Sequence, residues 1–197
     1  MDLWLWFSSR LRLPAAAALA VACVAIGMAA VPSGRLTVTS DAFAEGATIP
    51  DVYAHRGCAS GAQDRSPALA WRGVPAATKS FVVTLFDPDA PTGHGFWHWV
   101  MFDIPGDAHG LPAGAGVEHA SSAPHGAVGG HNDFGAAGYA GPCPPQGAKP
   151  HRYEFEVRAL DVATVPGASS ETTGPELVSA LAGHVLAEGT LAGRFGR

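Results

Sequence analysis

The side chains with the widest chemical range are concentrated in residues 86–105, FDPDAPTGHGFWHWVMFDIP. Asp87 and Asp89 stand two positions apart across a proline, and His94 and His98 follow them. These side chains could provide acid–base catalysis, metal ligands or a binding pocket that does no chemistry. Catalytic carboxylate pairs need environments that separate their pKa values, and nothing in the stretch supplies that separation. We expect Asp89 to accept backbone N–H groups at the turn, as Asp does beside proline.

A metal site is the sharper alternative to a binding pocket. His119, His125 and His131 recur every six residues, and together with His94 and His98 they could make a zinc or copper set. A six-residue period does not bring side chains to one face of a helix, and histidines in a Gly-rich loop are usually solvated. We therefore predict no metal ligands and no cofactor.

Several common enzyme classes lack their sequence signatures in this chain. There is no Gly-x-Ser-x-Gly elbow, no phosphate-binding Walker loop, no dinucleotide glycine fingerprint after a strand and no Cys-x-x-Cys pair. The formal charge is −5, and Lys and Arg are scattered rather than clustered with aromatic residues. We predict a non-enzymatic protein that does not bind nucleic acid.

The N-terminus has the pattern of a targeting element. Arg10 and Arg12 precede a run without charges that continues to Arg35, and residues 13–31 are almost wholly apolar. A positive segment before an apolar one is typical of a signal peptide, and this run is also long enough for a membrane anchor. We expect residues 1–34 to be a signal peptide or anchor, and residues 35–197 to form one exported, extracytoplasmic domain.

Two further points about this leader remain open. Cleavage near Gly27 and Ala29 is preferred to cleavage after Ala44, because the later site would remove RLTVTS (residues 35–40), which alternates like a first strand. Cys23 raises a lipoprotein alternative. Without the leader two cysteines remain, Cys58 and Cys143, which an oxidising compartment could join in a disulfide or leave as free thiols.

Three segments have the composition of strong strands: residues 79–87, 96–105 and 151–161. The last alternates apolar and charged residues, as in an antiparallel sheet with one wet face. Residues 174–189 predict one helix, with Pro175 in its first turn and Gly189 as its stop, and residues 190–195 suggest a final strand. Residues 106–149 show little periodicity, so we expect them to be either flexible or a set of functional loops held by the scaffold.

Four segments, in order, resemble the phosphatidylethanolamine-binding protein family, in its bacterial Raf-kinase-inhibitor-like branch. They are DRSPALAWRGVP (residues 64–75), FDPDAPTGHGFWHWVMFDIP (residues 86–105), NDFG (residues 132–135) and GYAGPCPPQGAKPHRYEFEVRALD (residues 138–161). HRGCAS, residues 55–60, departs from the more polar stretch expected there, and the C-terminal features of eukaryotic members are not recognisable. The resemblance therefore implies no kinase regulation.

The resemblance implies an all-β fold, an antiparallel Greek-key β-sandwich with a short C-terminal helix. It also implies a small anion-accepting pocket at one end of the sandwich. The ligand-binding residues carried over from the family's motifs are Asp87, His98, Gly141, Pro144, Pro145, His151 and Tyr153.

The chemistry of such a pocket requires converging donors, which imidazole N–H, phenolic O–H and loop N–H groups can supply. A carboxylate next to an anion is repulsive, so we expect Asp87 to fix the tautomer of a histidine, with binding of an ammonium group as the alternative. Because His98 must point into the pocket, Trp97 and Trp99 should both point away from it and serve packing.

Three functions are compatible with these features. The first is an exported binding protein for a small anionic or phosphorylated ligand, with a phospholipid headgroup as one candidate. The second is an interaction module that inhibits a protease or another enzyme through the loops of residues 106–149. The third, least favoured, is a metal-dependent hydrolase.

Overall fold

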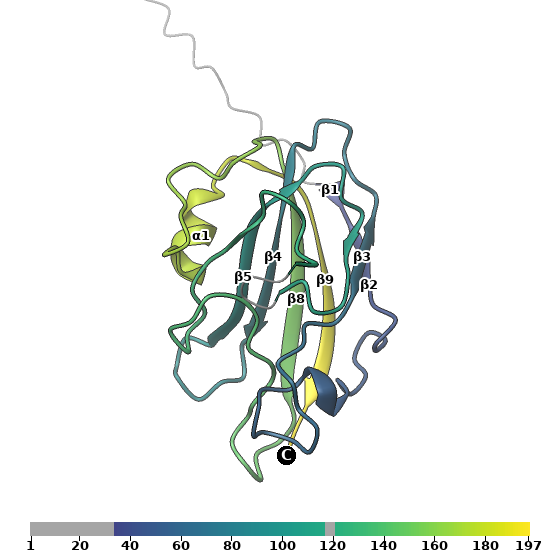
Figure 1. Ribbon diagram of the computed structural model, residues 1–197, viewed down its shortest axis with the longest axis vertical. Coiled ribbons are helices and arrows are strands. Elements are labelled where there is room, and N and C mark those ends of the chain that lie inside the picture. The colour runs from purple at the N-terminus through teal and green to yellow at the C-terminus, as the bar shows by residue number, and fades with distance from the viewer. Residues whose placement is uncertain (1–33, 117–120) are drawn as a thin grey trace, which may run out of the picture. The chain divides into compact units, whose positions relative to one another are not determined.

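The computed structural model describes residues 34–116 and 121–197, and strands dominate this part of the chain (Figure 1). The larger sheet has the order β1 (Gly34–Arg35), β9 (Val185–Phe195), β8 (His151–Leu160), β4 (Ser80–Asp87), β5 (Phe96–Pro105) and β7 (Val128–Gly129). The smaller sheet has the order β2 (Thr37–Thr39), β3 (Leu69–Arg72) and β6 (Gly110–Leu111). A 3₁₀ turn, η1 (Asp51–Tyr53), and one helix, α1 (Gly174–Ala180), complete the elements. The predicted β-sandwich with one short helix is confirmed.

All strand pairs in both sheets are antiparallel except the two-residue contact of β1 with β9. The expected leader lies outside the described residues. Among the residues described, no helix has both the length and the apolar character needed to cross a bilayer.

Apolar side chains pack on both faces of the larger sheet. The inner face meets the smaller sheet, where Trp71 of β3 packs on Phe81 of β4 with ring centroids 5.1 Å apart. The outer face is covered by α1, whose Leu177 packs with Val100 and Phe102 of β5 (Figure 1). Burying both faces explains why β4 is buried at almost every position and is mostly apolar, without the alternation of a half-exposed strand.

The C-terminal helix is shorter than the sequence predicts. It begins as expected, because Glu176 accepts the Thr173 N–H (2.9 Å) and closes a capping box, but it ends at Ala180. Gly183 has a φ of 84°, and β9 starts two residues later. Gly189 therefore does not stop a helix: it lies inside β9, where a Cβ would collide with the backbone of Leu36. Leu177, Leu181 and Val185 are spaced four residues apart, which favours a longer helix. In the structure the two-residue alternation of β9 against β8 outweighs that helical spacing.

A β-bulge in β5 sets the directions of the side chains that follow. Trp97 pairs with Phe86, and Trp99 pairs with Leu85. His98 between them is therefore an extra residue that has no pairing partner on β4. The bulge breaks strict alternation, and His98 and Trp99 both lie on the inner face. Our expectation that the two indoles share a face was wrong: Trp99 is 1% exposed in the core between the sheets, whereas Trp97 packs on Phe86 with centroids 4.7 Å apart.

The loops of residues 106–149 carry only the short strands β6 and β7 in their described part. They are nevertheless tied down. Asn132 is 4% exposed, donates its amide to the Gly138 carbonyl (3.0 Å) and accepts the Phe134 N–H (2.9 Å). These loops therefore hold fixed positions at the end of the large sheet, next to the predicted site residues.

Candidate functional site

A cavity of about 210 Å³ lies where β4 ends and where β5 and β8 begin. It is lined by Asp87, Ala90, Pro91, Thr92, Phe96, His98, Phe134, Cys143, Pro144, Pro145 and His151. Antiparallel order brings these segments together, because β4 enters this end of the sheet and its two neighbours leave it. Five of the seven predicted ligand-binding residues line the cavity; Gly141 and Tyr153 stand behind it.

Asp87 and His151 form a buried pair in the cavity wall. The Nδ1 of His151 lies 2.8 Å from Asp87 Oδ2, and the other carboxylate oxygen accepts the Asp89 N–H (2.9 Å). A carboxylate only accepts hydrogen bonds here, so Nδ1 carries the proton, and Nε2 is the nitrogen left for a ligand. This contact is the tautomer-fixing role expected for Asp87. Asp89 does accept a backbone N–H, but that of Arg152 on β8 (2.7 Å) rather than one in its own turn.

His98 is oriented by a carbonyl instead of a carboxylate. Its Nδ1 lies 3.0 Å from the oxygen of Ala140, and the side chain is almost fully buried, at 3% exposure. Burial lowers the pKa of His98 to about 4, outweighing the opposing influence of the Ala140 carbonyl and the Asp87 charge. The ring is therefore neutral near pH 7, and its N–H serves Ala140 instead of a ligand, contrary to the imidazole donor we expected at this position.

Tyr153 supplies a buried hydroxyl behind the two histidines. Its ring packs edge-on against His98, with centroids 5.3 Å apart, and the hydroxyl has no hydrogen-bond partner among the described residues. Burial and the neighbouring Asp87 charge raise the pKa of this phenol well above its ordinary value, so it keeps its proton. An unpartnered buried O–H is costly unless a ligand or water takes it.

The loop of residues 141–145 is fixed from several sides. Gly141 donates its N–H to Asp64 Oδ1 (2.9 Å), and a Cβ at this position would overlap the backbone of Tyr53 and Ala54. Arg197 donates from Nε to the Pro144 carbonyl (2.6 Å). Gly141 thus positions the loop by close approach and its N–H, whereas Pro144 and Pro145 face the cavity.

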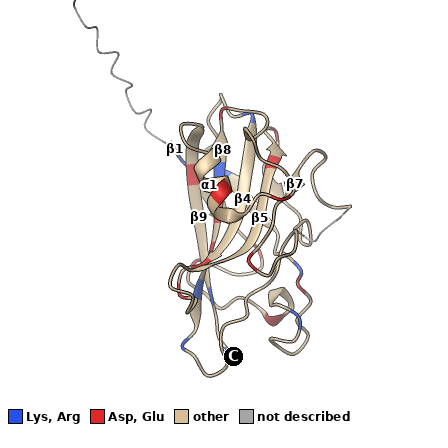
Figure 2. Cartoon of the chain, turned by 90° about the vertical axis from the view of Figure 1, so that its left-hand side faces the viewer, with Lys and Arg blue, Asp and Glu red and all other residues tan. Residues whose placement is uncertain are grey.

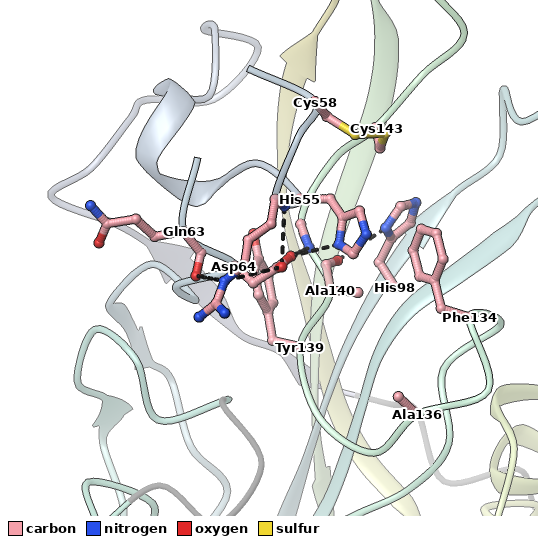
Figure 3. Close-up of polar contacts among 12 residues, drawn as sticks. His55, Cys58, Gln63, Asp64, His98, Phe134, Ala136, Tyr139, Ala140 and Cys143 are labelled. Atoms are coloured by element: carbon pink, nitrogen blue, oxygen red, sulfur yellow. Dashed lines mark hydrogen bonds and ion pairs between the residues drawn. A yellow bond between two sulfur atoms is a disulfide. The ribbon is translucent and has the colours of Figure 1, made fainter. Parts of the chain in front are cut away.

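A disulfide joins Cys143 in the cavity wall to Cys58, with a Cα–Cα distance of 5.4 Å. It links two segments that are 85 residues apart in the chain. Figure 3 shows this bridge above the His55, Asp64 and His98 side chains.

A second carboxylate–histidine pair stands beside His98 (Figure 3). His55 Nδ1 lies 2.8 Å from Asp64 Oδ1, and the His55 ring stacks on Phe134 with centroids 4.7 Å apart. Asp64 holds a φ of 54°, unusual for a residue other than glycine. We did not predict Asp64 and Phe134 as site residues, although both lie in segments that resemble the family. His55, which was also not predicted, lies in the segment that departs from the family.

The histidines of the proposed metal set are dispersed in the structure. His94 and His125 are exposed, His131 faces Glu171 at 3.6 Å, and His119 lies outside the described residues. Within the described part of the chain, no cluster of three or more His, Cys, Asp or Glu side chains could hold a metal ion.

With the sandwich and its end cavity described, comparison with known proteins defines the class. A sequence model of the family described as phosphatidylethanolamine-binding protein matches residues 39–196. The chain belongs to this family.

Particular relatives are bacterial proteins. The UPF0098 protein YbcL of Escherichia coli is 48% identical over 139 residues, which are 71% of this chain and 72% of YbcL. YbhB of the same organism is 42% identical over 142 residues, which are 71% of this chain and 89% of YbhB. The crystal structure of E. coli YbcL, described as a new member of the mammalian PEBP family, superposes with a TM-score of 0.78 at 39% identity, covering 83% of this chain and 99% of that one. A Chlamydia trachomatis homologue, CT736, gives a TM-score of 0.69 at 32% identity, covering 84% and 99%.

Proposed function

We propose that this chain is a non-enzymatic binding protein whose end cavity takes a small anionic group, foremost a phosphate. The observation that carries the proposal is the His151–Asp87 pair, which leaves the His151 Nε2 for a ligand in the cavity. A second proton on His151 makes it a cationic donor whose charge Asp87 balances.

The size of the cavity supports a small ligand. Pockets for drug-sized molecules occupy about 300–1,000 Å³, and this one, at about 210 Å³, suits a headgroup. The family description names phosphatidylethanolamine, and phosphoethanolamine is the phosphate monoester that corresponds to its headgroup. Pro91, Pro144 and Pro145 stiffen the rim, which lowers the entropy lost on binding.

The lining residues also support binding without catalysis. Cys143 is tied up in a disulfide, and the Thr92 hydroxyl donates to the Gly95 carbonyl (2.6 Å), so neither is an activated nucleophile. Among the described residues, no Lys or Arg lines the cavity. Figure 2 shows charges of both signs interspersed over the strands and loops it displays. The His151 ring, rather than a basic patch, would therefore meet the charge of the ligand.

We further propose an exported location for the domain. The Cys58–Cys143 disulfide supports it, because such bonds persist in oxidising compartments and are rare in the cytosol. The apolar segment of residues 13–31 supports it independently.

Replacing Asp87 tests the binding proposal. In Asp87→Asn the amide oxygen can still accept the His151 N–H, but the charge that balances an imidazolium is lost. We expect phosphoethanolamine to bind at least about tenfold more weakly by titration calorimetry, with an unchanged far-ultraviolet circular dichroism spectrum. Asp89→Asn is the matched control, since this carboxylate is two residues away and outside the lining. Equal affinities for wild type and Asp87→Asn would reject the proposal.

A further inference from the structure

The tautomer of His98 determines what this side chain offers a ligand. Its Nδ1 faces the Ala140 carbonyl at 3.0 Å, and a carbonyl can only accept, so Nδ1 carries the proton. The opposite ring nitrogen, Nε2, then has a lone pair, and in the described residues it makes no hydrogen bond to protein. Figure 3 shows this second nitrogen turned away from Ala140, and the ring lines the cavity.

The surroundings keep the ring in this neutral state. Asp87 on β4, His151 and Tyr153 on β8, and His55 from the adjoining loop are the titratable groups around it. Burial opposes a charge on His98, and the nearby His55 acts in the same direction. Together they outweigh the Ala140 and Gly141 carbonyls and the Asp87 charge, which favour the charged form, and leave a pKa of about 4. At neutral pH, His98 accepts a hydrogen bond at Nε2 and cannot donate one there.

We propose that the cavity selects oxyanions that carry a proton, such as hydrogen phosphate and singly protonated phosphate monoesters, because His98 presents a fixed acceptor to them. The inference rests on the proposed anion-binding function and adds the protonation state of the ligand. The bound P–OH donates to His98 Nε2, while an unprotonated oxygen accepts from Nε2 of a doubly protonated His151 across the cavity.

Phosphate and sulfate separate this inference from simple charge attraction. Both are tetrahedral anions of similar size, but near neutral pH phosphate keeps an O–H and sulfate has none. A sulfate oxygen facing His98 Nε2 would set two lone pairs against each other in a buried site. A polar group left unpaired in this way lowers affinity by roughly 10- to 100-fold.

The primary experiment measures the affinities of the wild-type protein for phosphate and for sulfate by titration calorimetry. The pH range is about 6 to 8, which lies above the His98 pKa of about 4. Phosphate should bind at least about tenfold more tightly than sulfate throughout. A change in the net charge of the protein would affect the binding of both anions, so the ratio of affinities reports the acceptor and not the charge of the protein.

A second ligand pair holds the charge of the anion constant. At about pH 5.5 methyl phosphate is mainly a monoanion with one O–H, because the second pKa of a phosphate monoester is about 6. Dimethyl phosphate is also a monoanion and has no O–H. We expect methyl phosphate to bind at least about tenfold more tightly.

The His98→Gln variant tests the assignment to this residue. Its amide can donate towards the ligand, so the preference for phosphate over sulfate should fall towards unity, whereas the exposed His125→Gln control should keep it. Equal phosphate and sulfate affinities in wild type would overturn the selection while leaving anion binding intact. If neither anion bound at all, the proposed function would fail and the inference with it. The wild-type ratio decides the matter even if His98→Gln does not fold.

Discussion

The strand wall of the cavity, formed by Asp87, Phe96, His98 and His151, stands on β4, β5 and β8, whereas the loop wall, residues 143–145, stands on no strand. Ladder hydrogen bonds along these long strands fix the strand wall. The loop wall is held by separate cross-links: the Cys58–Cys143 disulfide, the Arg197 bond to Pro144 and, at Gly141, the bond to Asp64.

This difference assigns different vulnerabilities to the two walls. A strand residue is positioned by many cooperative contacts, so changing one side chain alters chemistry more than shape. A loop held by a few cross-links loses its position when one of them is removed. The disulfide and the Arg197 bond can each be removed without changing a residue of the strand wall. A third experiment changes the protonation of His98 in the strand wall and leaves both cross-links in place.

Removal of the disulfide should have the largest effect and should act on the loop wall. In Cys58→Ser/Cys143→Ser the unfolded chain regains the freedom of a loop that spans 85 positions, and chain-entropy models predict a loss of about 4.5 kcal/mol in the free energy of unfolding. Urea denaturation measures it.

Reduction of the wild-type protein provides the control for this double variant. A reductant should lower the stability of wild type to that of the variant and leave the variant unchanged. A variant as stable as oxidised wild type would show that the remaining cross-links hold the loop wall alone.

Acidification should act next most strongly, through the strand wall. The pKa of His98 is about 4 in the folded protein, against about 6.5 in an unfolded chain, so only the unfolded state takes up this proton between those values. The stabilisation is complete above about pH 6.5 and is lost as the pH falls towards about 4, amounting to about 3 kcal/mol.

Comparison with His98→Gln isolates this contribution from all other titrating groups. The free energy of unfolding of wild type minus that of the variant should fall by about 3 kcal/mol between about pH 7 and pH 4. A pH-independent difference would mean that His98 is protonated as readily in the folded protein as in the unfolded chain.

Removal of the Arg197 contact should have the smallest effect. Arg197→Met deletes one hydrogen bond to the Pro144 carbonyl, a loss of about 1 kcal/mol in unfolding free energy. Phosphate affinity should fall as well, because the loop wall loses a support. Arg194→Met removes an equal charge from an exposed position of β9 and serves as the control. If both variants lost the same stability and phosphate affinity, the change in net charge, and not the bond to Pro144, would account for the effect.

Much of the strand wall could be predicted from the sequence, and less of the loop wall. Local composition was sufficient for β4, β5 and β8, since each is a long run with clear signals, and the family motifs indicated Asp87, His98 and His151 as site residues. The bulge at His98 could not be predicted, because it is a property of the register between two strands. The same limit applies to Gly189. A glycine is needed there because the backbone of Leu36, which is distant in the sequence, leaves no room for a Cβ.

Several contacts around the two walls join distant parts of the chain. Ala140 orients His98 through its backbone oxygen. Every residue has such an oxygen, so the residue type at this position does not indicate the contact. The His55–Asp64 pair spans nine residues of irregular chain, with Asp64 in a left-handed conformation that its neighbours do not indicate. Sequence patterns indicate periodic elements well, but not these single long-range hydrogen bonds.

The bulge in β5 also bears on how this site could be transplanted. Because His98 and Trp99 share the inner face, one strand supplies both a wall of the cavity and a plug of the hydrophobic core. Grafting residues 86–105 onto a regular hairpin would preserve the sequence but not the arrangement of its side chains. Strict alternation would turn either the His98 imidazole or the Trp99 indole outward. A designer would have to import the register of β4 together with the graft.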